Sequence, residues 1–586
     1  MIGGFEMEEK KYVSTLKPHL KYYPEKPHRE FDSNQTLFNL IKDANQITID
    51  YDAIGYFGHA FTYKELLKDV DRLAHSLLQI GIRENDVVLV GMPTTPEVAK
   101  VLLALNKIGA VSKWIDIQLN ADALEKYINE NGSKYVILFD KLLPMLEKII
   151  DNTDVYKAII TRPSDSLSFP EKIGYMLQSK REGTYFQVPK DKRFVEFTSL
   201  IKQGNTKDII MPAKYDKEKT TLIIQSSGTT GMAKSIAHTD FSTNEAIKKL
   251  SHSDLPLDAG KSLLVTVPPW VGYGLINSYL TSLAHGMQAV LCPKVDRTTV
   301  LDNVGKFNTA FAAPLHYRCL VENIEKCKDL SEIEALITGG DKITSEELTN
   351  MMEILSQKGF NGQIINGYGN NEGLGGETVN PMKHNRLGSV GIPFYGNTVA
   401  AFDSKMQELP INEQGEIAVK TSTMFKEYID NPIETSRVKK RHPDGSIWIH
   451  TGDLGRIDED GFVYIEGRLS RVIISRSFKV FPGTIENIIK KHPAVKACIT
   501  VGVKDAQFMG VPMAHIVLNE EYFDRTEEVL EELNELCLAN LKDYEVPMYY
   551  NILDSIPYTQ NNKEDFRYLE NLGNELIEGQ KIRKRY

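Results

Sequence analysis

A short segment in the middle of the chain combines small, hydroxyl-bearing and basic residues in a way that suits phosphate binding. It follows the apolar run 222–224, which predicts a buried strand. Glycines let backbone N–H groups approach phosphate oxygens, hydroxyls add donors, and a lysine adds positive charge. The segment reads Ser226, Ser227, Gly228, Thr229, Thr230, Gly231, Met232, Ala233, Lys234. We expect it to be a loop for polyphosphate.

The same segment comes close to the Walker phosphate loop, GxxxxGK[ST]. From Gly228 to Ser235 it matches at every required position except Ala233, where the motif demands glycine. A kinase or another NTPase is therefore an alternative function, and the other motifs in the chain have to decide whether it holds.

Four further segments carry groups that suit nucleotide chemistry. Tyr368 lies in the glycine-rich stretch 367–372 and offers a flat face for adenine, while Glu372 in the same stretch can hold Mg²⁺ against ATP phosphates. Asp453, in Thr-Gly-Asp, has a carboxylate suited to both hydroxyls of a ribose, and Arg468 follows in a Gly-Arg pair. Near the C-terminus, Lys563 can bring a cation to two anions that must approach each other.

Together the five segments resemble the signature of the adenylate-forming superfamily, which contains acyl-CoA synthetases, peptide-synthetase adenylation domains and luciferases. The loop 226–234 is similar to the family's nucleotide loop, and residues 367–372, 451–453, 467–468 and 557–563 resemble its GYGxTE, TGD, hinge GR and PxTxxGK motifs in the same order. The resemblance extends over nearly the whole chain. A Walker NTPase has no reason to carry the other four segments, so we disfavour it.

The resemblance implies a two-step reaction with ATP and Mg²⁺ as cofactors. A carboxylate attacks the α-phosphate, pyrophosphate leaves, and a thiol then attacks the acyl-AMP. The implied catalytic residues are Lys563 and Glu372, with Glu372 also the metal ligand. The implied ATP-binding residues are Ser226, Ser227, Gly228, Thr229, Thr230, Gly231, Lys234, Tyr368, Gly369, Asn370, Asn371, Asp453 and Arg468. The implied acyl pocket contains Trp270, Val271, Tyr273, Gly339 and Gly340, and the implied hinge is Ser470.

Several positions depart from the family pattern. Ala233 and Ser235 replace the usual proline and glycine, Asn371 replaces a threonine that contacts the α-phosphate, Ser470 replaces the hinge Asp or Lys, and Ser477 and Asn562 replace glycines. These departures keep open a non-catalytic, nucleotide-binding homologue. The retention of Glu372, Asp453 and Lys563 argues against it.

The acyl segment 268–274 favours an acid whose tail carries no charge. No acidic residue occurs between Ser262 and Lys294, so the ammonium group of an α-amino acid would be buried without a partner. Val271 stands where a histidine is common in the family. We expect an aryl or medium-chain carboxylic acid, although Trp270 and Tyr273 could also be ordinary core aromatics.

The acceptor thiol is open to two interpretations. Residues 478–486 resemble acyl-CoA synthetases, whereas residues 563–570 resemble the ending of adenylation domains that load the phosphopantetheine of a carrier protein. We favour CoA slightly, with the carrier protein as the alternative. A luciferase-like oxidation of the acyl adenylate is a further alternative.

Alternating helices and strands must position these residues. Thr62 and Glu65 have the spacing of a capping box, and apolar residues then recur at helical spacing as far as Gly81. The short apolar runs 87–90, 101–105 and 136–139 follow, and this alternation predicts a parallel α/β sheet. Short strands with turn residues are expected over 385–465, and a compact pattern after Arg468 includes a strand at 495–501 and a helix at 527–541.

The expected fold class is α/β. A large N-terminal domain (1–469) of two α/β subdomains and a small β subdomain would be hinged to a small, mobile C-terminal α+β domain (470–586) that carries the catalytic lysine.

The composition excludes several classes of protein. With 79 acidic and 69 basic residues among 586, the net charge of -10 disfavours a general nucleic-acid binder. The five cysteines include no CxxC pair, which favours a reducing cytoplasm over a disulfide framework. We find no signal sequence and no apolar run of about 18 residues that would predict a transmembrane segment.

Overall fold

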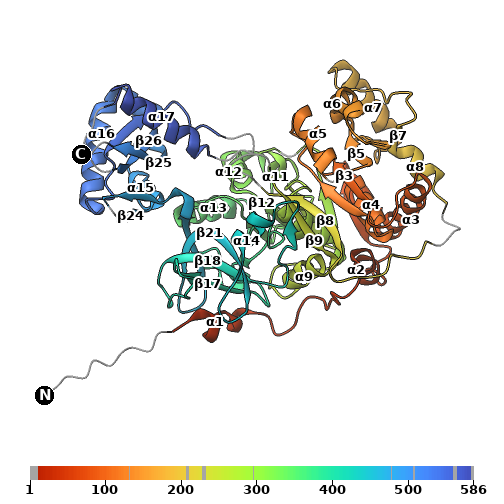
Figure 1. Ribbon diagram of the computed structural model, residues 1–586, viewed down its shortest axis with the longest axis horizontal. Helices are drawn as coiled ribbons and strands as arrows, with labels where there is room; N and C mark the ends of the chain where they lie inside the picture. The colour runs from red at the N-terminus through yellow and green to blue at the C-terminus, as the bar shows by residue number, and fades with distance from the viewer. Residues whose placement is uncertain are drawn as a thin grey trace. The chain divides into compact units, whose positions relative to one another are not determined.

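The computed structural model describes residues 11–130, 132–205, 210–226, 233–294, 296–476, 478–505, 509–558 and 564–582 (Figure 1). Its residue contacts divide the chain into two compact units. The first comprises Met1–Val399, Ala418–His450 and Ile457–Val463, and the second comprises Ala400–Ile417, Thr451–Arg456 and Tyr464–Tyr586. The boundary that the sequence predicts, after residue 469, lies a few residues beyond the end of the first unit.

The first unit contains an eight-stranded sheet in the order β19-β9-β8-β4-β3-β5-β6-β7. Its strands are β3 (Val87–Gly91), β4 (Val111–Trp114), β5 (Tyr135–Phe139), β6 (Lys157–Thr161), β7 (Phe194–Glu196), β8 (Thr220–Gln225), β9 (Ser235–Thr239) and β19 (Glu427–Tyr428). From β8 to β7 the neighbours are parallel, whereas β8, β9 and β19 pair antiparallel. The antiparallel edge matters for the site because it brings β19 beside the strands that flank the predicted phosphate loop.

A nine-stranded sheet, also in the first unit, has the order β16-β15-β14-β13-β12-β10-β11-β1-β2. Its strands are β1 (Asp52–Tyr56), β2 (His59–Thr62), β10 (Ser262–Val265), β11 (Gln288–Leu291), β12 (Thr309–Ala312), β13 (Ala335–Thr338), β14 (Gln363–Tyr368), β15 (Thr378–Val379) and β16 (Ile392–Pro393). Strand β14 ends at Tyr368, so the predicted nucleotide loop leaves the sheet at the end of a strand.

Helices pack around these sheets, and two of them show how the sequence produces the packing. Helix α3 (Tyr63–Gln79) begins with the predicted capping box of Thr62 and Glu65, buries its apolar stripe, and packs against α4 and α8. Every residue of α4 (Pro96–Lys107) is buried, which explains its uninterrupted apolar run. The other helices of this unit are α1 (Val13–Leu16), α2 (Leu37–Ala44), α5 (Ala121–Glu130), α6 (Leu143–Ile149), α7 (Phe169–Arg181), α8 (Phe197–Gln203), α9 (Asp240–Ser251), α10 (Thr281–Ala284), α11 (Thr299–Asp302), α12 (Pro314–Glu322), α13 (Ser345–Ser356) and α14 (Pro432–Val438).

The second unit has a core of its own around a three-stranded sheet, in the order β25-β26-β27. Its elements are β23 (Ile473–Ser475), β24 (Phe478–Val480), α15 (Pro482–Ile489), β25 (Val495–Asp505), β26 (Met509–Leu518), α16 (Thr526–Asn540), β27 (Tyr549–Ile552) and α17 (Phe566–Glu578). The residues of four further strands are divided between the two units: β17 (Thr398–Phe402), β18 (Gly415–Lys420), β21 (Ile447–Ile457) and β22 (Val463–Arg468). Strand β20 (Lys439–Arg441) belongs to the first unit. None of the helices in the described ranges combines the length and apolar character needed to span a bilayer.

Candidate active site

The predicted phosphate loop connects two antiparallel strands, β8 and β9. Gln225 pairs with Ser235 across the two strands. Beyond this pair, the Ser226 N–H donates to the Lys234 carbonyl and the Lys234 N–H donates to Ser226 Oγ, each over 2.9 Å. The two ends of the loop are therefore held together. The predicted loop residues Ser227, Gly228, Thr229, Thr230 and Gly231 lie outside the described residues.

The ammonium group of Lys234 is held by an acidic and an aromatic side chain. Its Nζ lies 2.9 Å from Glu434 Oε2 and 4.7 Å from the centroid of the Tyr428 ring. Glu434 lies in the first turn of α14, where its N–H donates to the Asn431 side chain that caps the helix. The hydrogen bond from Lys234 lowers the pKa of Glu434, so the carboxylate stays charged beside the lysine.

Tyr428 also contacts the candidate metal ligand. Its hydroxyl donates to Glu372 Oε1 over 2.6 Å, and the N–H of Phe425 donates to the Glu372 carbonyl over 2.7 Å. Burial, together with the neighbouring Glu372 carboxylate, raises the pKa of Tyr428, so the phenol keeps the proton that it donates. One buried tyrosine thus joins the phosphate-loop lysine to Glu372, and its hydrogen bond fixes the orientation of the carboxylate.

The predicted nucleotide loop after Tyr368 folds back on itself and needs glycine at two positions. A Cβ on Gly369 would lie 1.8 Å from the carbonyl oxygen of Gly375, and Gly375 itself has a φ of +97°. The Asn370 side-chain oxygen accepts from the N–H of Gly373 over 2.7 Å and closes the turn. Gly369, which the sequence singles out, is therefore required by close backbone approach, and Gly375, which it does not, by its positive φ.

Asn371 ties three parts of the site together. Its Nδ2 donates to the carbonyl of Gln225 over 2.7 Å, and its Oδ1 accepts from the N–H of Gly272 over 2.9 Å. The Asn371 carbonyl lies 2.9 Å from His238 Nε2. Burial lowers the pKa of His238 to about 3, so the imidazole is neutral and Nε2 must carry the proton that it donates to this carbonyl. The predicted contact of Asn371 with the α-phosphate stays a prediction.

The predicted acyl segment leads into a π-helix, Tyr273–Leu280. The Tyr273 hydroxyl donates to the Ile337 carbonyl over 3.2 Å, and its ring meets Phe311 edge-on with centroids 6.0 Å apart. Because its polar atom is satisfied, Tyr273 presents an apolar ring. Trp270 and Val271, just before the helix, are half-buried.

Predicted pocket glycines adjoin this segment. A Cβ on Gly339 would lie 3.1 Å from the Gly367 carbonyl oxygen and 3.9 Å from Tyr273 Cζ, and Gly340 has a φ of +83°. A side chain at position 339 would therefore crowd the Gly367 carbonyl of the nucleotide loop and contact Tyr273 of the acyl segment. The structure brings these two predicted regions together.

The predicted ribose ligand lies in the second unit. Asp453 is nearly buried in β21, and its Oδ1 lies 2.8 Å from Nε of the predicted Arg468. Arg468 also donates from Nη1 to the Thr451 carbonyl over 3.0 Å, so it holds both ends of the Thr-Gly-Asp turn. Ser470 lies in the short 3₁₀-helix Leu469–Arg471. Lys563, Asn562 and Ser477 lie outside the described residues.

A buried polar network that the sequence does not predict lies beneath the nucleotide loop. Glu377 is fully buried, and its Oε2 accepts from Asn397 Nδ2 over 2.8 Å, while Lys249 Nζ donates to Asn397 Oδ1 over 2.5 Å. A Cβ on Gly373 would lie 1.5 Å from Glu377 Oε1, so the carboxylate packs directly against the loop. Burial raises the pKa of Glu377 to about 8 and lowers that of Lys249 to about 8.

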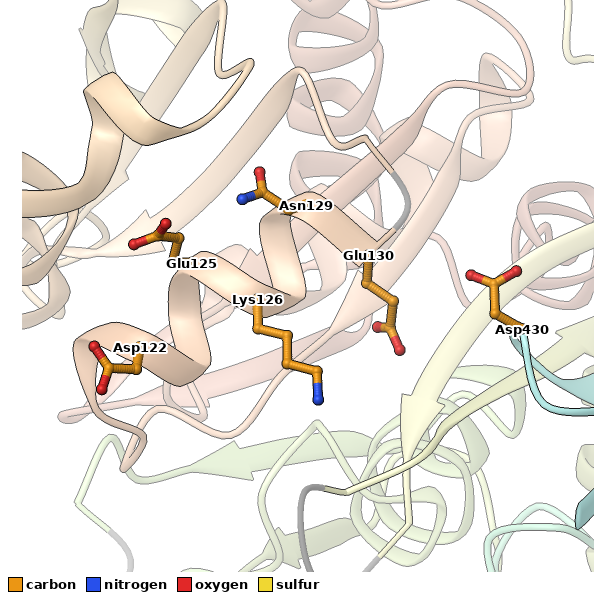
Figure 2. Close-up of a pocket in the computed structure, with 6 residues that line it drawn as sticks. All are labelled: Asp122, Glu125, Lys126, Asn129, Glu130 and Asp430. Atoms are coloured by element: carbon orange, nitrogen blue, oxygen red, sulfur yellow. The ribbon is translucent and has the colours of Figure 1, made fainter.

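An open hollow of about 620 Å³ lies beside α5, and Figure 2 shows the side chains that line it. Its lining residues are Asp122, Glu125, Lys126, Asn129, Glu130 and Asp430, and four of these six side chains are carboxylates. Glu130 accepts from Ser235 Oγ over 2.9 Å, so the hollow adjoins the strand that follows the phosphate loop. The negative charge of these carboxylates would repel a triphosphate, so the hollow itself does not suit ATP.

Comparisons with known proteins identify the family and the fold of the chain. The sequence model described as AMP-binding enzyme matches residues 41–429, and that of the AMP-binding enzyme C-terminal domain matches residues 484–563. A long-chain-fatty-acid–CoA ligase of Bacillus subtilis (strain 168) is 28% identical over 566 residues, 94% of this chain and 97% of that protein. A 4-coumarate–CoA ligase 4 of Arabidopsis thaliana is 26% identical over 478 residues, 80% of this chain and 79% of that protein.

Two solved structures share the fold over almost their whole length. ATP-bound MatB from Rhodopseudomonas palustris aligns with a TM-score of 0.79 at 21% identity, and the anthranilate CoA ligase AuaEII in complex with anthranoyl-AMP aligns with a TM-score of 0.78 at 19% identity. Each alignment covers 93% of this chain and 99% of the other. The predicted α/β fold class, with a large N-terminal and a smaller C-terminal part, is therefore confirmed. The chain belongs to the AMP-binding enzyme family, the adenylate-forming superfamily that its motifs resemble, and is an AMP-forming acid–thiol ligase.

Proposed function

We propose that this protein activates a carboxylic acid with an uncharged, apolar tail, using ATP and releasing pyrophosphate, and then transfers the acyl group from acyl-AMP to CoA. The observation that carries the proposal is the contact chain from Lys234 through Tyr428 to Glu372, which links a phosphate-loop cation to a carboxylate suited to a metal ion. Family membership supports the same chemistry.

In the first step, a carboxylate has to approach a triphosphate against their mutual repulsion. Lys234 supplies positive charge at the phosphate loop, Glu372 would hold Mg²⁺ at the phosphates, and Lys563 would supply a second cation. Bound there, Mg²⁺ offsets phosphate charge. Tyr368 would pack on adenine, and Asp453 would bind the ribose hydroxyls. The backbone of the loop 226–234 would position the phosphates, and no protein nucleophile is required.

The acyl specificity is proposed from the segment that Tyr273 begins. The Tyr273 ring, the edge-on Phe311 and the absence of acidic residues from 262 to 294 favour an aryl or medium-chain tail. A matched relative is named as a ligase of long-chain fatty acids and another as a ligase of 4-coumarate. CoA is proposed over a carrier protein because both of these relatives are CoA ligases.

The test is Mg²⁺-dependent ATP–pyrophosphate exchange with four groups of acids: benzoates and cinnamates, medium-chain acids, long-chain acids and α-amino acids. We expect exchange with uncharged aryl or medium-chain acids, followed by thioester formation with CoA but not with a phosphopantetheinylated carrier protein. Exchange restricted to α-amino acids would refute the proposed pocket, and the absence of exchange with every acid would refute the activity.

A further inference from the structure

Helix α7 presents an apolar stripe at the molecular surface that the proposed catalysis does not use. Phe169 is 77% exposed, Ile173 is 40% exposed and Leu177 is 59% exposed. Residues four apart lie on one face of a helix, so the three side chains form a continuous row of about 12 Å. Figure 1 shows α7 near α6 and β7 within the first unit.

The opposite face of α7 carries the polar contacts that hold the helix in place. Ser179 is buried, and Lys172 Nζ donates to the carbonyl of Asp165 over 2.7 Å. Glu171, the acidic residue of this helix, bonds Ser168 at the N-cap and lies 2.6 Å from His59 of β2. A surface helix ordinarily buries its apolar stripe and exposes its polar face. Helix α7 instead leaves Phe169, Ile173 and Leu177 exposed.

The exposed face also carries positive charge. At 3.6 residues per turn, the exposed Lys180 falls between Phe169 and Ile173 around the helix, and the exposed Arg181 lies just beyond Leu177. Glu171 projects from the other side, so this face holds cations and apolar side chains without a carboxylate. Lys180 lies 5.1 Å from the Tyr185 ring, which keeps its stem along the surface.

We propose that α7 docks on the surface of an anionic lipid bilayer, with Phe169, Ile173 and Leu177 entering the acyl boundary and Lys180 and Arg181 meeting headgroup phosphates. Apolar residues on one face, flanked by Lys and Arg, are the pattern of helices that lie in the bilayer interface. The proposal concerns where the enzyme resides and does not depend on which acid it activates.

Two other occupants fit the observations less well. The core of a protein–protein interface is depleted in lysine, whereas Lys180 lies within the apolar row. A second copy of the chain docked through the same face would offer no carboxylate to Lys180 and Arg181, because the face carries none. A bilayer with anionic headgroups has the complementary charge.

The test is co-sedimentation of the full chain with sucrose-loaded vesicles of phosphatidylcholine alone, and of phosphatidylcholine containing about one-third phosphatidylglycerol. The variants are Phe169→Ser with Leu177→Ser, and Lys180→Glu with Arg181→Glu. The control is Ile47→Ser with Met211→Ser, which removes two apolar side chains elsewhere that are at least as exposed on average, 85% and 76%. Circular dichroism checks the folding of each variant.

We expect binding to the anionic vesicles that weakens as salt is added, and a loss of about tenfold or more in both α7 variants. The control should bind like the wild type. Equal partitioning onto neutral and anionic vesicles, no binding at all, or unchanged binding by folded α7 variants would overturn the proposal. Concentration-dependent dimerisation of the wild type that the α7 variants abolish would assign the face to a second copy instead.

Discussion

At the residue scale, the hydroxyl of Tyr428 contacts the candidate metal ligand Glu372, and its ring contacts the phosphate-loop residue Lys234. Tyr428→Phe keeps the ring beside Lys234 but removes the 2.6 Å hydrogen bond to Glu372. We expect the rate of pyrophosphate exchange to fall by at least about tenfold, because a hydrogen bond to a charged group contributes about 1.5–3 kcal/mol. The Mg²⁺ concentration for half-maximal exchange should also rise, because the carboxylate is no longer oriented.

The matched control is Tyr63→Phe, which removes another buried hydroxyl, one that donates to the Met287 carbonyl over 2.7 Å. A merely structural loss would affect both variants alike. An unchanged Mg²⁺ dependence in Tyr428→Phe would remove the positioning role.

The buried Glu377 makes a separate prediction about pH. Its pKa is raised to about 8, whereas in the unfolded chain it is about 4.5. Between these values the unfolded state has lost the proton and the folded state keeps it, so this group makes stability fall as pH rises from about 5 to 8. Lys249, with a pKa lowered to about 8, is charged in both states up to about pH 7 and adds no pH dependence below that pH.

Glu377→Gln keeps the shape of the side chain and removes this titration. We therefore expect the thermal unfolding midpoint of the wild type to fall, relative to that of Glu377→Gln, as the pH is raised from about 5 to 8. Groups that do not interact with Glu377 titrate equally in both proteins and cancel in the difference. Parallel pH curves for the two proteins would show that Glu377 is not protonated in the folded state.

Lys563 is the residue on which the proposed first step depends. Lys563→Ala should abolish acyl-AMP formation and leave the capture of preformed acyl-AMP by CoA largely intact, because the charge is needed only while carboxylate and triphosphate coexist. The two half-reactions are measured separately by pyrophosphate exchange and by thioester formation. Lys581→Ala serves as the control lysine near the C-terminus, and an equal fall of both half-reactions in folded Lys563→Ala would contradict the assigned role.

At the element scale, the N-terminus of α3 forms the capping box that the sequence predicts. Thr62 accepts from the Glu65 N–H, and the Glu65 side chain accepts from the Thr62 N–H. Thr62→Ala should lower the free energy of unfolding by about 1 kcal/mol, since a donor at the helix end loses its partner. Glu65→Gln, which can still accept that hydrogen bond, should cost much less in the same urea titration. Equal costs would show that the reciprocal cap does not stabilise the helix.

The elements also show where sequence patterns stop being informative. The apolar run 101–105 follows a strand and resembles one, but the structure places it in α4, where burial on all sides removes the helical periodicity. Strand β19 is only two residues long and pairs with β9 at Tyr428 and Ile236. So short a strand has no detectable period. The sequence could not predict Tyr428, Glu434 or the Lys249–Glu377 network, because contacts between distant parts of the sequence bring these residues to the site. Motifs of glycine and hydroxyl residues can be predicted because all their residues lie in one short segment.

At the scale of the whole molecule, the candidate site residues are divided between the two units. Lys234, Tyr368 and Glu372 belong to the first, and Asp453 and Arg468 belong to the second. The chain passes from one unit to the other after residues 399, 417, 450, 456 and 463, and β17, β18 and β21 each contribute residues to both. Turn residues and polarity along the sequence predict one domain boundary, because they carry no information on which strands contact each other.

The hinge prediction belongs to this scale. Family resemblance implies that the C-terminal domain pivots near Ser470 between acyl-AMP formation and thioester formation, and a pivot requires a large backbone-angle change at a few residues. Ser470 is the middle residue of the 3₁₀-helix Leu469–Arg471. Proline at this position would fix its φ near -65° and disfavour the helical conformation of Leu469, so the backbone would lose one of its arrangements.

We expect Ser470→Pro to form acyl-AMP at a near-normal rate in single-turnover assays, because that step precedes the pivot. Thioester formation should fall at least about tenfold, which corresponds to a barrier increase of about 1.4 kcal/mol. Ser470→Ala leaves φ and ψ free and should retain both rates, which separates backbone restriction from loss of the hydroxyl. Because proline acts only on local backbone angles, a folded Ser470→Pro enzyme that keeps both rates, or loses both equally, would place the pivot elsewhere in the chain.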